Sequence, residues 1–128
     1  MSRVYIAGPY SCKTTDGNVI EILSNMRRGL AISIQVMQAG HAVFCVWLDF
    51  TLGLIADIPM EMFKRNSMEW IKVSDAMLLV NGWQDSAGCR AEVAEASLHG
   101  VPVFEQHEFV NMLVFLNDAA NQDVTGQL

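Results

Sequence analysis

The sequence predicts an α/β fold, because short continuous apolar runs alternate along the chain with longer segments of helical periodicity. Two of the expected helix-to-strand turns also resemble each other, since each contains a glycine, Gly40 or Gly100, and leads into an apolar run. Strand–helix–strand connections of this kind are right-handed in nearly all proteins. We therefore expect a Rossmann-like or flavodoxin-like three-layer sandwich around a mostly parallel four-stranded sheet in the order 2-1-3-4.

The first strand is predicted at Val4–Ala7, where an apolar run is stopped by Gly8-Pro9. The loop that follows, Tyr10–Gly17, is rich in Ser, Thr, Lys and Asp. It has neither the glycine spacing of a dinucleotide-binding loop nor that of a Walker phosphate-binding loop. Dinucleotide and ATP sites of those two kinds are therefore disfavoured.

A long helix is predicted over Asn18–Ala39, because apolar residues recur three or four positions apart and Gly40 follows as a stop. Two adjacent basic residues within it, Arg27 and Arg28, are interpreted as a solvated or interface face. The second strand is predicted at Ala42–Trp47. These segments complete a first strand–helix–strand unit.

The next segment, Leu48–Pro59, has no clear pattern. Its polar residues Asp49, Thr51 and Asp57 follow the second strand and so lie toward the carboxyl edge of the sheet, where open α/β folds bind ligands. One interpretation is a loop that recognises a base, with Asp49 as a substrate-binding residue. The other is an ordinary connection or an interface, given apolar residues such as Leu52.

The second half of the chain repeats the alternation. Later elements are predicted as a helix at Met60–Val73, a strand at Ala76–Val80, a further helix, and a strand at Val101–Phe104. A last helix is expected from Phe109 to Asn117, and no apolar run remains for a fifth strand. We therefore expect one domain over residues 1–118 and a polar, fraying tail over residues 119–128.

Charge and composition limit the class of partner. The net charge is −6 and the longest basic run is Arg27-Arg28, so duplex DNA or RNA is disfavoured, whereas a small nucleoside or nucleotide with one phosphate is compatible. Apolar residues make up 52% of the chain and charged residues only 17%, which favours a homodimer or larger homo-oligomer. A monomer of low charge is the alternative.

Cysteine usage and the terminus indicate the compartment. The three cysteines, Cys12, Cys45 and Cys89, have no Cys-x-x-Cys spacing, which is typical of reduced thiols. The N-terminus has no charged-then-apolar signal, and no apolar run approaches the roughly 18 residues of a membrane span. We therefore expect a cytoplasmic protein that does not contact a membrane.

The chain is organised around the stretch from Ser86 to Glu92, which follows the apolar run Ala76–Val80. We expect Glu92 in the first turn of a helix, with Ser86 and Gly88 just before it, where backbone N–H groups lack partners. The helix dipole would then keep Glu92 charged at neutral pH. Such a carboxylate also has a purely structural explanation, because it stabilises the end of its helix.

Three short motifs resemble those of one family. They are Ser86-x-Gly88-x-x-x-Glu92 after a buried strand, Gly-x-Pro-Val at residues 100–103, and Tyr-Ile-Ala-Gly-Pro at residues 5–9. Their order is similar to that of the nucleoside 2-deoxyribosyltransferase-like superfamily. That superfamily includes deoxyribosyltransferases, 2'-deoxynucleoside 5'-phosphate N-hydrolases, and small uncharacterised proteins, some of them from phages.

The resemblance implies a role for each motif. Glu92 would be the nucleophile on the anomeric carbon of the sugar, and Tyr5 would reach it from the first strand. The loop that begins at Gly8 and Pro9 would border the sugar and any 5'-phosphate. Without the resemblance, Tyr5 is equally well explained as a strand residue that packs within the sheet.

One position departs from the family. In the N-hydrolases the corresponding helix carries Asp-x-x-Trp-x-x-x-x-Asp, and its first Asp is catalytic; aligned on Trp70 and Asp75, that position is Ser67. A neutral hydroxyl cannot replace an acidic proton donor. Either another acid, such as Asp49 or Asp57, takes the role, or the activity is altered or lost. Ser67 is retained as a candidate substrate-binding residue.

The sequence thus predicts cleavage or transfer of the N-glycosidic bond of a nucleoside or nucleoside 5'-monophosphate through a Glu nucleophile. In the resemblance, a Ser at position 86 goes with the phosphate-binding hydrolases, so Ser86 is expected to hold a 5'-phosphate or a sugar hydroxyl. We expect no cofactor and no metal, because His41, His99 and His107 share no ligand spacing. The alternatives are a non-catalytic nucleotide-binding protein on the same fold and an oligomeric interaction protein.

Overall fold

The computed structural model describes residues 1–10 and 19–126, with side chains described as far as Asn121. Most of the predicted loop at residues 10–17, with Cys12, lies outside these ranges. Four parallel strands form the sheet in the order β2-β1-β3-β4, which confirms the predicted topology. The strands are β1 (Arg3–Ala7), β2 (Ala42–Cys45), β3 (Ala76–Leu79) and β4 (Val103–Glu105).

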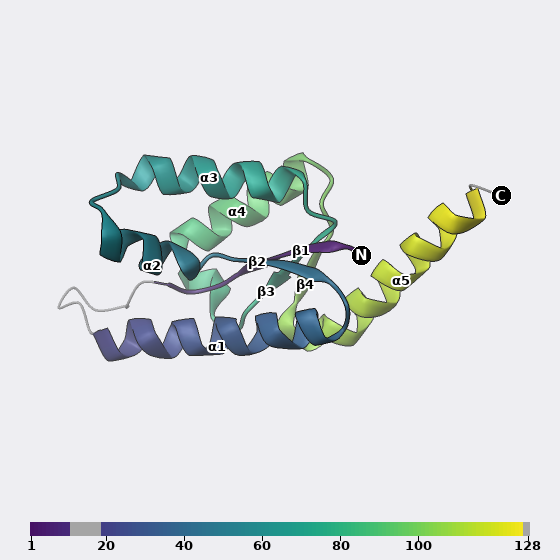
Figure 1. Cartoon of the computed structure of the whole chain (residues 1–128), viewed down its shortest axis with the longest axis horizontal. Helices are drawn as coiled ribbons and strands as arrows, with labels where there is room; N and C mark the ends of the chain where they lie inside the picture. Colours follow the sequence, from purple (N-terminus) through teal and green to yellow (C-terminus); the bar gives the residue numbers. More distant parts are fainter. Residues whose placement is uncertain (11–18, 127–128) are drawn as a thin grey trace.

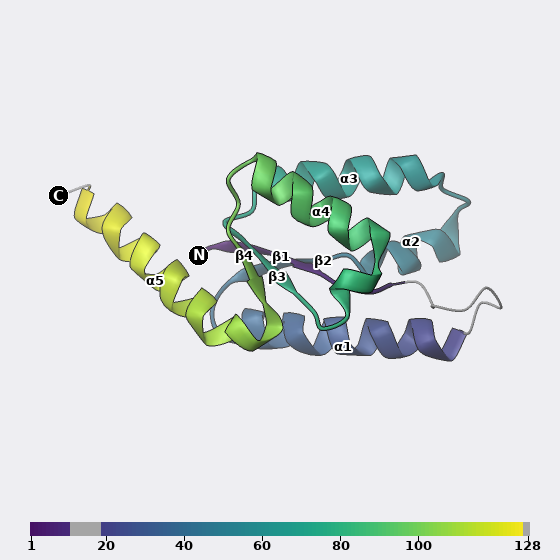
Figure 2. The same cartoon turned by 180° about the vertical axis from the view of Figure 1, so that it is seen from behind.

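Helices cover both faces of this sheet and give three layers (Figure 1). One face carries α1 (Val19–Gln38) and the start of α5 (Phe109–Gly126); the other carries α2 (Leu48–Ile55), α3 (Met60–Lys72) and α4 (Ala87–Leu98). Short 3-10 turns, η1 (Trp83–Asp85) and η2 (Gln106–Glu108), follow β3 and β4. The later part of α5 projects beyond the sheet in both views (Figure 2). Within the described ranges, no helix has both the length and the apolar content needed to cross a membrane.

Two segments differ from the prediction. The unassigned stretch after the second strand begins with α2, none of whose residues is buried. Its apolar residues fall mostly at alternate positions, which hides the helical period in the sequence. The last helix was expected to end at Asn117 but continues to Gly126, because Ala119 and Ala120 are strong helix formers and no proline interrupts the polar residues that follow.

The two central strands form the core of the molecule. Every residue from Val4 to Ala7 and from Ala76 to Val80 is at most 1% exposed, as expected for parallel strands covered on both faces. Gly40 and Gly100 follow α1 and α4 with φ of 95° and 69°, so both act as the predicted helix stops. Because all the strand pairs are parallel, the carboxyl ends of the strands lie at one edge of the sheet.

Trp47 connects the segment after β2 with the segment after β1. Its indole N–H donates to the carbonyl oxygen of Pro9 at 3.0 Å, and its ring is fully buried. Gly29 of α1 leaves room for the ring, since a Cβ there would lie 2.4 Å from Trp47. Gly8 is equally confined, because its Cβ would lie 2.7 Å from that of Val80. Both glycines are needed for close packing.

We expect Gly29→Ala to lower the free energy of unfolding by about 1–3 kcal/mol, because the added methyl group overlaps the Trp47 ring. This loss exceeds the gain of about 1 kcal/mol that Ala has over Gly within a helix. Gly53→Ala in α2 is the matched control, since nothing lies within 4 Å of a Cβ there, and it should keep or raise stability. Urea denaturation followed by circular dichroism measures both variants. Equal stabilities would contradict the packing described.

Candidate functional site

Tyr5 and Glu92 form a hydrogen bond at the carboxyl edge of the sheet. Tyr5 extends from β1 and is fully buried, and Glu92 lies half-buried on α4. The phenol O–H donates to a carboxylate oxygen of Glu92. Because β3, which leads to α4, pairs directly with β1, the topology joins two residues that are 87 positions apart.

The helix that carries Glu92 begins earlier than the sequence predicts. Ser86 is its N-cap, and the Ser86 hydroxyl oxygen accepts a hydrogen bond from the backbone N–H of Cys89 at 3.2 Å. The helix therefore starts at Ala87, so Gly88 lies inside the first turn and Glu92 lies in the second. The prediction of Glu92 in the first turn is wrong. Since the helix dipole acts mainly within the first turn, it stabilises a charge on Glu92 only weakly.

Burial is the main cause of the shifted pKa values of Tyr5 and Glu92. It raises the pKa of Glu92 to about 7; the hydrogen bond from Tyr5 opposes this rise and the charge of Asp49 adds to it. The expectation of a fully charged Glu92 at neutral pH is therefore wrong. Burial, and then the charge of Glu92, hold the pKa of Tyr5 well above its usual range. Tyr5 thus remains a hydrogen-bond donor, whereas Glu92 is divided between two protonation states near pH 7.

Two further predicted residues approach the pair. Ser67 on α3 is 7% exposed, and its hydrogen bond to Tyr5 opposes the rise in the Tyr5 pKa. Asp49 lies half-buried in the first turn of α2, and its charge raises the pKa of both Tyr5 and Glu92. Asp57 is exposed and lines a separate hollow. Of the two acids considered from the sequence, Asp49 is therefore the one whose charge acts on Tyr5 and Glu92.

A stack of three aromatic rings supports Tyr5. Phe44 of β2 stacks on Tyr5 with ring centroids 5.2 Å apart and planes at 16°. Trp70 of α3 stacks on Phe44 at 5.2 Å and 22°. Because Trp70 is 45% exposed, the stack runs from the core to the surface. It restrains the plane of the Tyr5 ring and hence the position of its hydroxyl group.

A groove of about 680 Å³ lies at the same edge, beside the start of α4. Three predicted residues, Pro9, Ser86 and Gly88, line it. Gly8 is instead buried against Val80 and Trp47 and serves the packing of the core. The other lining residues come from α1 and from the segment between β3 and α4: Glu21, Ser24, Asn25, Arg28, Asn81, Gly82, Asp85 and Ala87.

Arg28 is the residue of this groove that the sequence analysis assigned elsewhere, to a solvated or interface face. Its guanidinium donates to Asn25 Oδ1 at 2.7 Å and to the carbonyl oxygen of Asn81 at 3.4 Å. Asn25 is 6% exposed and donates to the carbonyl oxygen of Tyr10 at 3.5 Å. The spacing of Asn25 and Arg28 on one helix is visible in the sequence. That this helix turns Arg28 toward the start of α4 depends on how α1 packs on the sheet.

Comparisons with known proteins agree with the fold. Residues 2–108 match a family described as "Domain of unknown function (DUF1937)". The chain belongs to this family. No curated protein matches it. A solved structure, from work on a 2-deoxyribosyltransferase of the psychrotolerant bacterium Bacillus psychrosaccharolyticus, has a TM-score of 0.55 and 18% sequence identity over 81% of this chain and 71% of its own. A likeness at this identity shows a shared fold.

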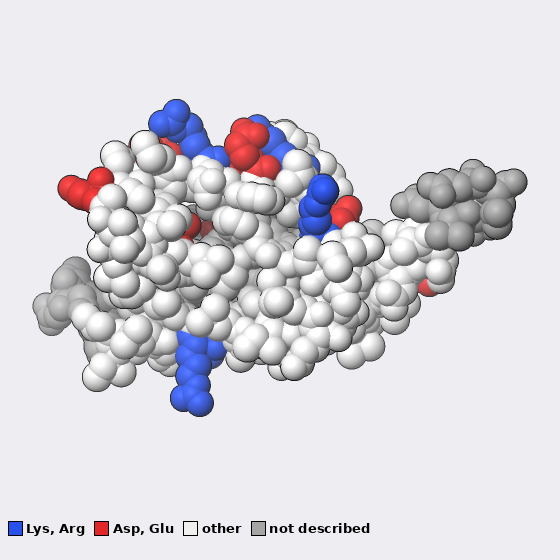
Figure 3. All heavy atoms as spheres, in the orientation of Figure 1, with Lys and Arg blue, Asp and Glu red and all other residues white. Residues whose placement is uncertain are grey.

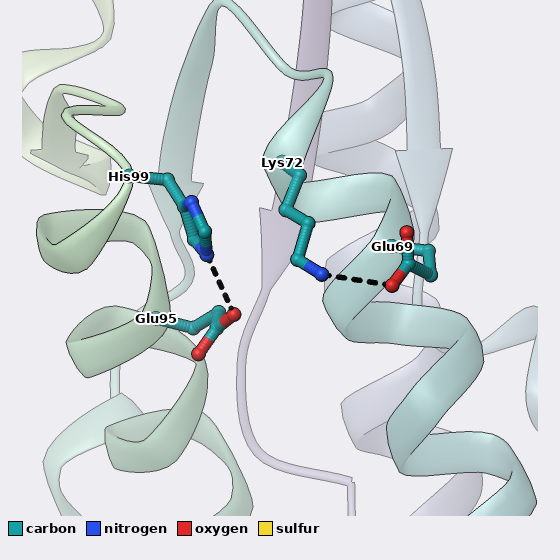
Figure 4. Close-up of polar contacts among 4 residues, drawn as sticks. All are labelled: Glu69, Lys72, Glu95 and His99. Carbon is teal, nitrogen blue, oxygen red and sulfur yellow. Dashed lines mark hydrogen bonds and ion pairs between the residues drawn. The ribbon is translucent and has the colours of Figure 1, made fainter.

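The C-terminal ends of α3 and α4 carry a polar cluster that is separate from the Tyr5–Glu92 pair (Figure 4). Lys72 pairs with Glu69 at 2.8 Å on α3, and His99 contacts Glu95 at 2.9 Å across one turn of α4. Glu95 lies on the same helix as Glu92, but its partner is His99. Glu95 is therefore a carboxylate on α4 that takes no part in the Tyr5–Glu92 hydrogen bond.

A cluster of possible metal ligands and the thiol of Cys89 remain, and the structure accounts for both without a catalytic role. Glu105, His107 and Glu108 place potential ligand atoms within 4.8 Å of one another. Glu105 and Glu108 form the capping box of η2, and Glu105 also accepts a hydrogen bond from the indole of Trp83 at 3.1 Å. Burial, with the charge of Glu92, raises the pKa of Cys89 to about 12, so this thiol stays protonated and is a poor nucleophile.

The raised pKa of Glu92 predicts how stability depends on pH. Below about pH 4.5 Glu92 is protonated in both the folded and the unfolded chain, and its contribution is complete. As the pH rises toward 7, the unfolded chain releases the proton first, so up to about 3 kcal/mol of stability is lost. Above pH 7 the contribution is constant. Glu92→Gln should remove this part of the slope, as measured by urea denaturation from pH 4 to 8. Identical slopes for the two proteins would contradict the assigned pKa.

Proposed function

We propose that this protein cleaves or transfers the N-glycosidic bond of a nucleoside or nucleoside 5'-monophosphate, with Glu92 as the nucleophile. The observation that carries the proposal is the hydrogen bond from buried Tyr5 to Glu92 at the carboxyl edge of the sheet. Open parallel sheets bind their ligands at this edge. A carboxyl group held there by a fixed donor is suited to attack a sugar carbon.

The chemistry follows from the charge that develops in the sugar. As the bond between the anomeric carbon and the base breaks, the sugar becomes cationic, and a nearby carboxylate stabilises or bonds to it. Tyr5 orients Glu92 by donating to one oxygen, which leaves the other oxygen for the sugar. Water then completes hydrolysis, or a second base completes transfer.

The groove supplies a place for a 5'-phosphate. Ser86 and Gly88 line it where the first N–H groups of α4 lack helical partners, and Arg28 adds a positive charge. An anion at a helix N-terminus is stabilised by these N–H groups and by the dipole. Arg28 and these N–H groups support a phosphate here, whereas Glu21 and Asp85 in the same groove oppose a further negative charge.

The structural comparison supports the same class of reaction. The similar solved structure comes from work on a 2-deoxyribosyltransferase described as a biocatalyst for the synthesis of nucleosides. The shared fold supports a role in nucleoside chemistry and leaves hydrolysis or transfer to experiment.

A non-catalytic nucleotide-binding protein is the second candidate. Ser67 favours it, because a hydroxyl group occupies the position at which the N-hydrolases that this chain resembles carry their acid. On this reading, a nucleoside monophosphate would bind and no base would be released. An oligomeric interaction protein would bind no nucleotide, which calorimetry distinguishes.

We expect Glu92→Gln to lower base release by about 10³-fold or more, because it removes the nucleophile and keeps the shape of the side chain. Tyr5→Phe should cost about 10- to 100-fold, as a hydrogen bond to a charged group contributes about 1.5–3 kcal/mol. Free base is followed by chromatography over a panel of ribo- and deoxyribonucleotides.

Glu95→Gln is the matched control for this experiment, since it makes the same change on the same helix at a carboxylate paired with His99. It should leave the rate unchanged. Turnover by Glu92→Gln at the rate of the wild type would contradict the assignment of Glu92 as the nucleophile. Nucleotide binding without release of base by the wild type would establish the second candidate.

We also propose that the chain forms a homodimer or larger homo-oligomer through its apolar helix faces. Leu30, Ile34 and Met37 of α1 are exposed, as are Trp70 and Val73 near the end of α3. Figure 3 shows few charged side chains over α1 on this face of the molecule. We expect light scattering at micromolar concentration to give at least twice the monomer mass of 14.2 kDa. The monomer mass would rule out this assembly.

A further inference from the structure

We propose that Glu105 and Gln106 are positioning residues that hold one wall of the groove in place for a nucleotide. This wall is the segment Asn81–Ser86, which joins β3 to α4 and lines the groove through four of its residues: Asn81, Gly82, Asp85 and Ser86. Glu105 and Gln106 do not themselves line the groove. The inference rests on the function proposed above and assigns two residues to its binding site.

The sheet brings the groove wall next to Glu105 and Gln106. Strands β3 and β4 pair in parallel, with Leu79 opposite Glu105 (Figure 2). The groove wall follows β3, and Gln106 begins the 3-10 turn that follows β4. Because parallel strands end at the same edge of a sheet, these two segments are neighbours.

Two hydrogen bonds join the two segments. The carboxylate of Glu105 accepts from the indole N–H of Trp83 at 3.1 Å. The side-chain carbonyl oxygen of Gln106 accepts from the backbone N–H of Asn81 at 3.0 Å. Hydrogen bonds to a carboxylate are stronger than those between neutral groups, so the bond from Trp83 is the main attachment of the groove wall to β4.

Glu105 is suited to this role because its own position is fixed. Its carboxylate also accepts from the backbone N–H of Glu108, and its backbone N–H donates to Glu108 Oε1 at 2.9 Å. These two bonds form the capping box of η2. A side chain that is already restrained loses little further conformational freedom when it binds Trp83, so the contact relates the position of the groove wall to that of β4.

The groove wall in turn holds groups that would meet the ligand. The carbonyl oxygen of Asn81 accepts from the guanidinium of Arg28 at 3.4 Å. The backbone N–H of Ser86, the N-cap of α4, donates to the carbonyl oxygen of Trp83 at 3.1 Å. Displacement of the wall would therefore disturb both Arg28 and the first turn of α4, which are the groups that support a phosphate.

The Tyr5–Glu92 pair is held by other contacts. Glu92 lies in the second turn of α4, and its hydrogen bond comes from Tyr5 of β1. Loss of the Glu105–Trp83 bond should therefore weaken the binding of the nucleotide and largely preserve the chemical step. A rise in KM with kcat unchanged is the kinetic sign of lost binding that the ground state and the transition state share.

The test measures kcat and KM for a nucleoside 5'-monophosphate that the wild type cleaves. We expect Glu105→Ala and Trp83→Phe each to raise KM by about 3- to 30-fold and to change kcat by less than about twofold. Gln106→Ala should raise KM by about 2- to 10-fold, because its bond joins neutral groups. Glu105→Gln should keep KM within about threefold of the wild type, since an amide oxygen still accepts from the indole.

A double-mutant cycle separates positioning from a general loosening of the fold. Glu105→Ala and Trp83→Phe remove the same bond, so the double variant should raise KM no further than either single variant. Glu108→Ala is the control, because it breaks the capping box and keeps the bond from Trp83 to Glu105, and it should leave KM unchanged. Should Glu105→Ala fail to fold, Trp83→Phe still tests the bond, since it removes the N–H and keeps an aromatic ring.

An unchanged KM in Trp83→Phe, additive effects in the double variant, or an equal rise of KM in Glu108→Ala would overturn the inference. If the wild type binds the nucleotide without releasing base, the dissociation constant from calorimetry replaces KM, and the same changes are expected. A wild type that binds no nucleotide would instead defeat the proposed function itself, and the inference with it.

Discussion

The hydrogen bond between Tyr5 and Glu92 constrains the structure around it, because it satisfies two polar groups that the fold removes from water. A buried phenol or carboxyl group without a partner costs about 1–3 kcal/mol or more. Tyr5 is held by the pairing of β1 with its neighbours, and Glu92 by the position of α4. Their contact therefore requires the sheet edge and the helix to keep one relative position. Phe44 stacks on the Tyr5 ring, and Trp70 stacks on Phe44.

Helix α4 connects this pair with the groove. Its N-cap, Ser86, and its first turn line the groove, and its second turn carries Glu92. Arg28 reaches the same groove from the opposite layer, so both helical layers line one groove.

Placing carboxyl groups at a partly buried edge has an energetic consequence. Burial raises the pKa of Glu92 to about 7 and also raises that of Asp49, so charging them at neutral pH opposes folding. In the proposed reaction, the same burial would exclude competing water and strengthen the interaction of Glu92 with a cationic sugar. Stability and the proposed reactivity would then depend on the same desolvation.

The sequence alone determined the parallel sheet, its order and the approximate bounds of α1 and α3, because apolar runs, periodicity and the glycines at positions 40 and 100 are local signals. It also singled out Tyr5, Ser86 and Glu92 through motifs. Only the tertiary structure decided that the charge of Asp49 acts on Tyr5, that Asp57 lines a separate hollow, that Arg28 lines the groove, and that burial raises the pKa of Glu92 to about 7. The physical reason is that the direction of a helix face and the desolvation of a side chain depend on how distant segments pack, and no pattern within one segment records that packing.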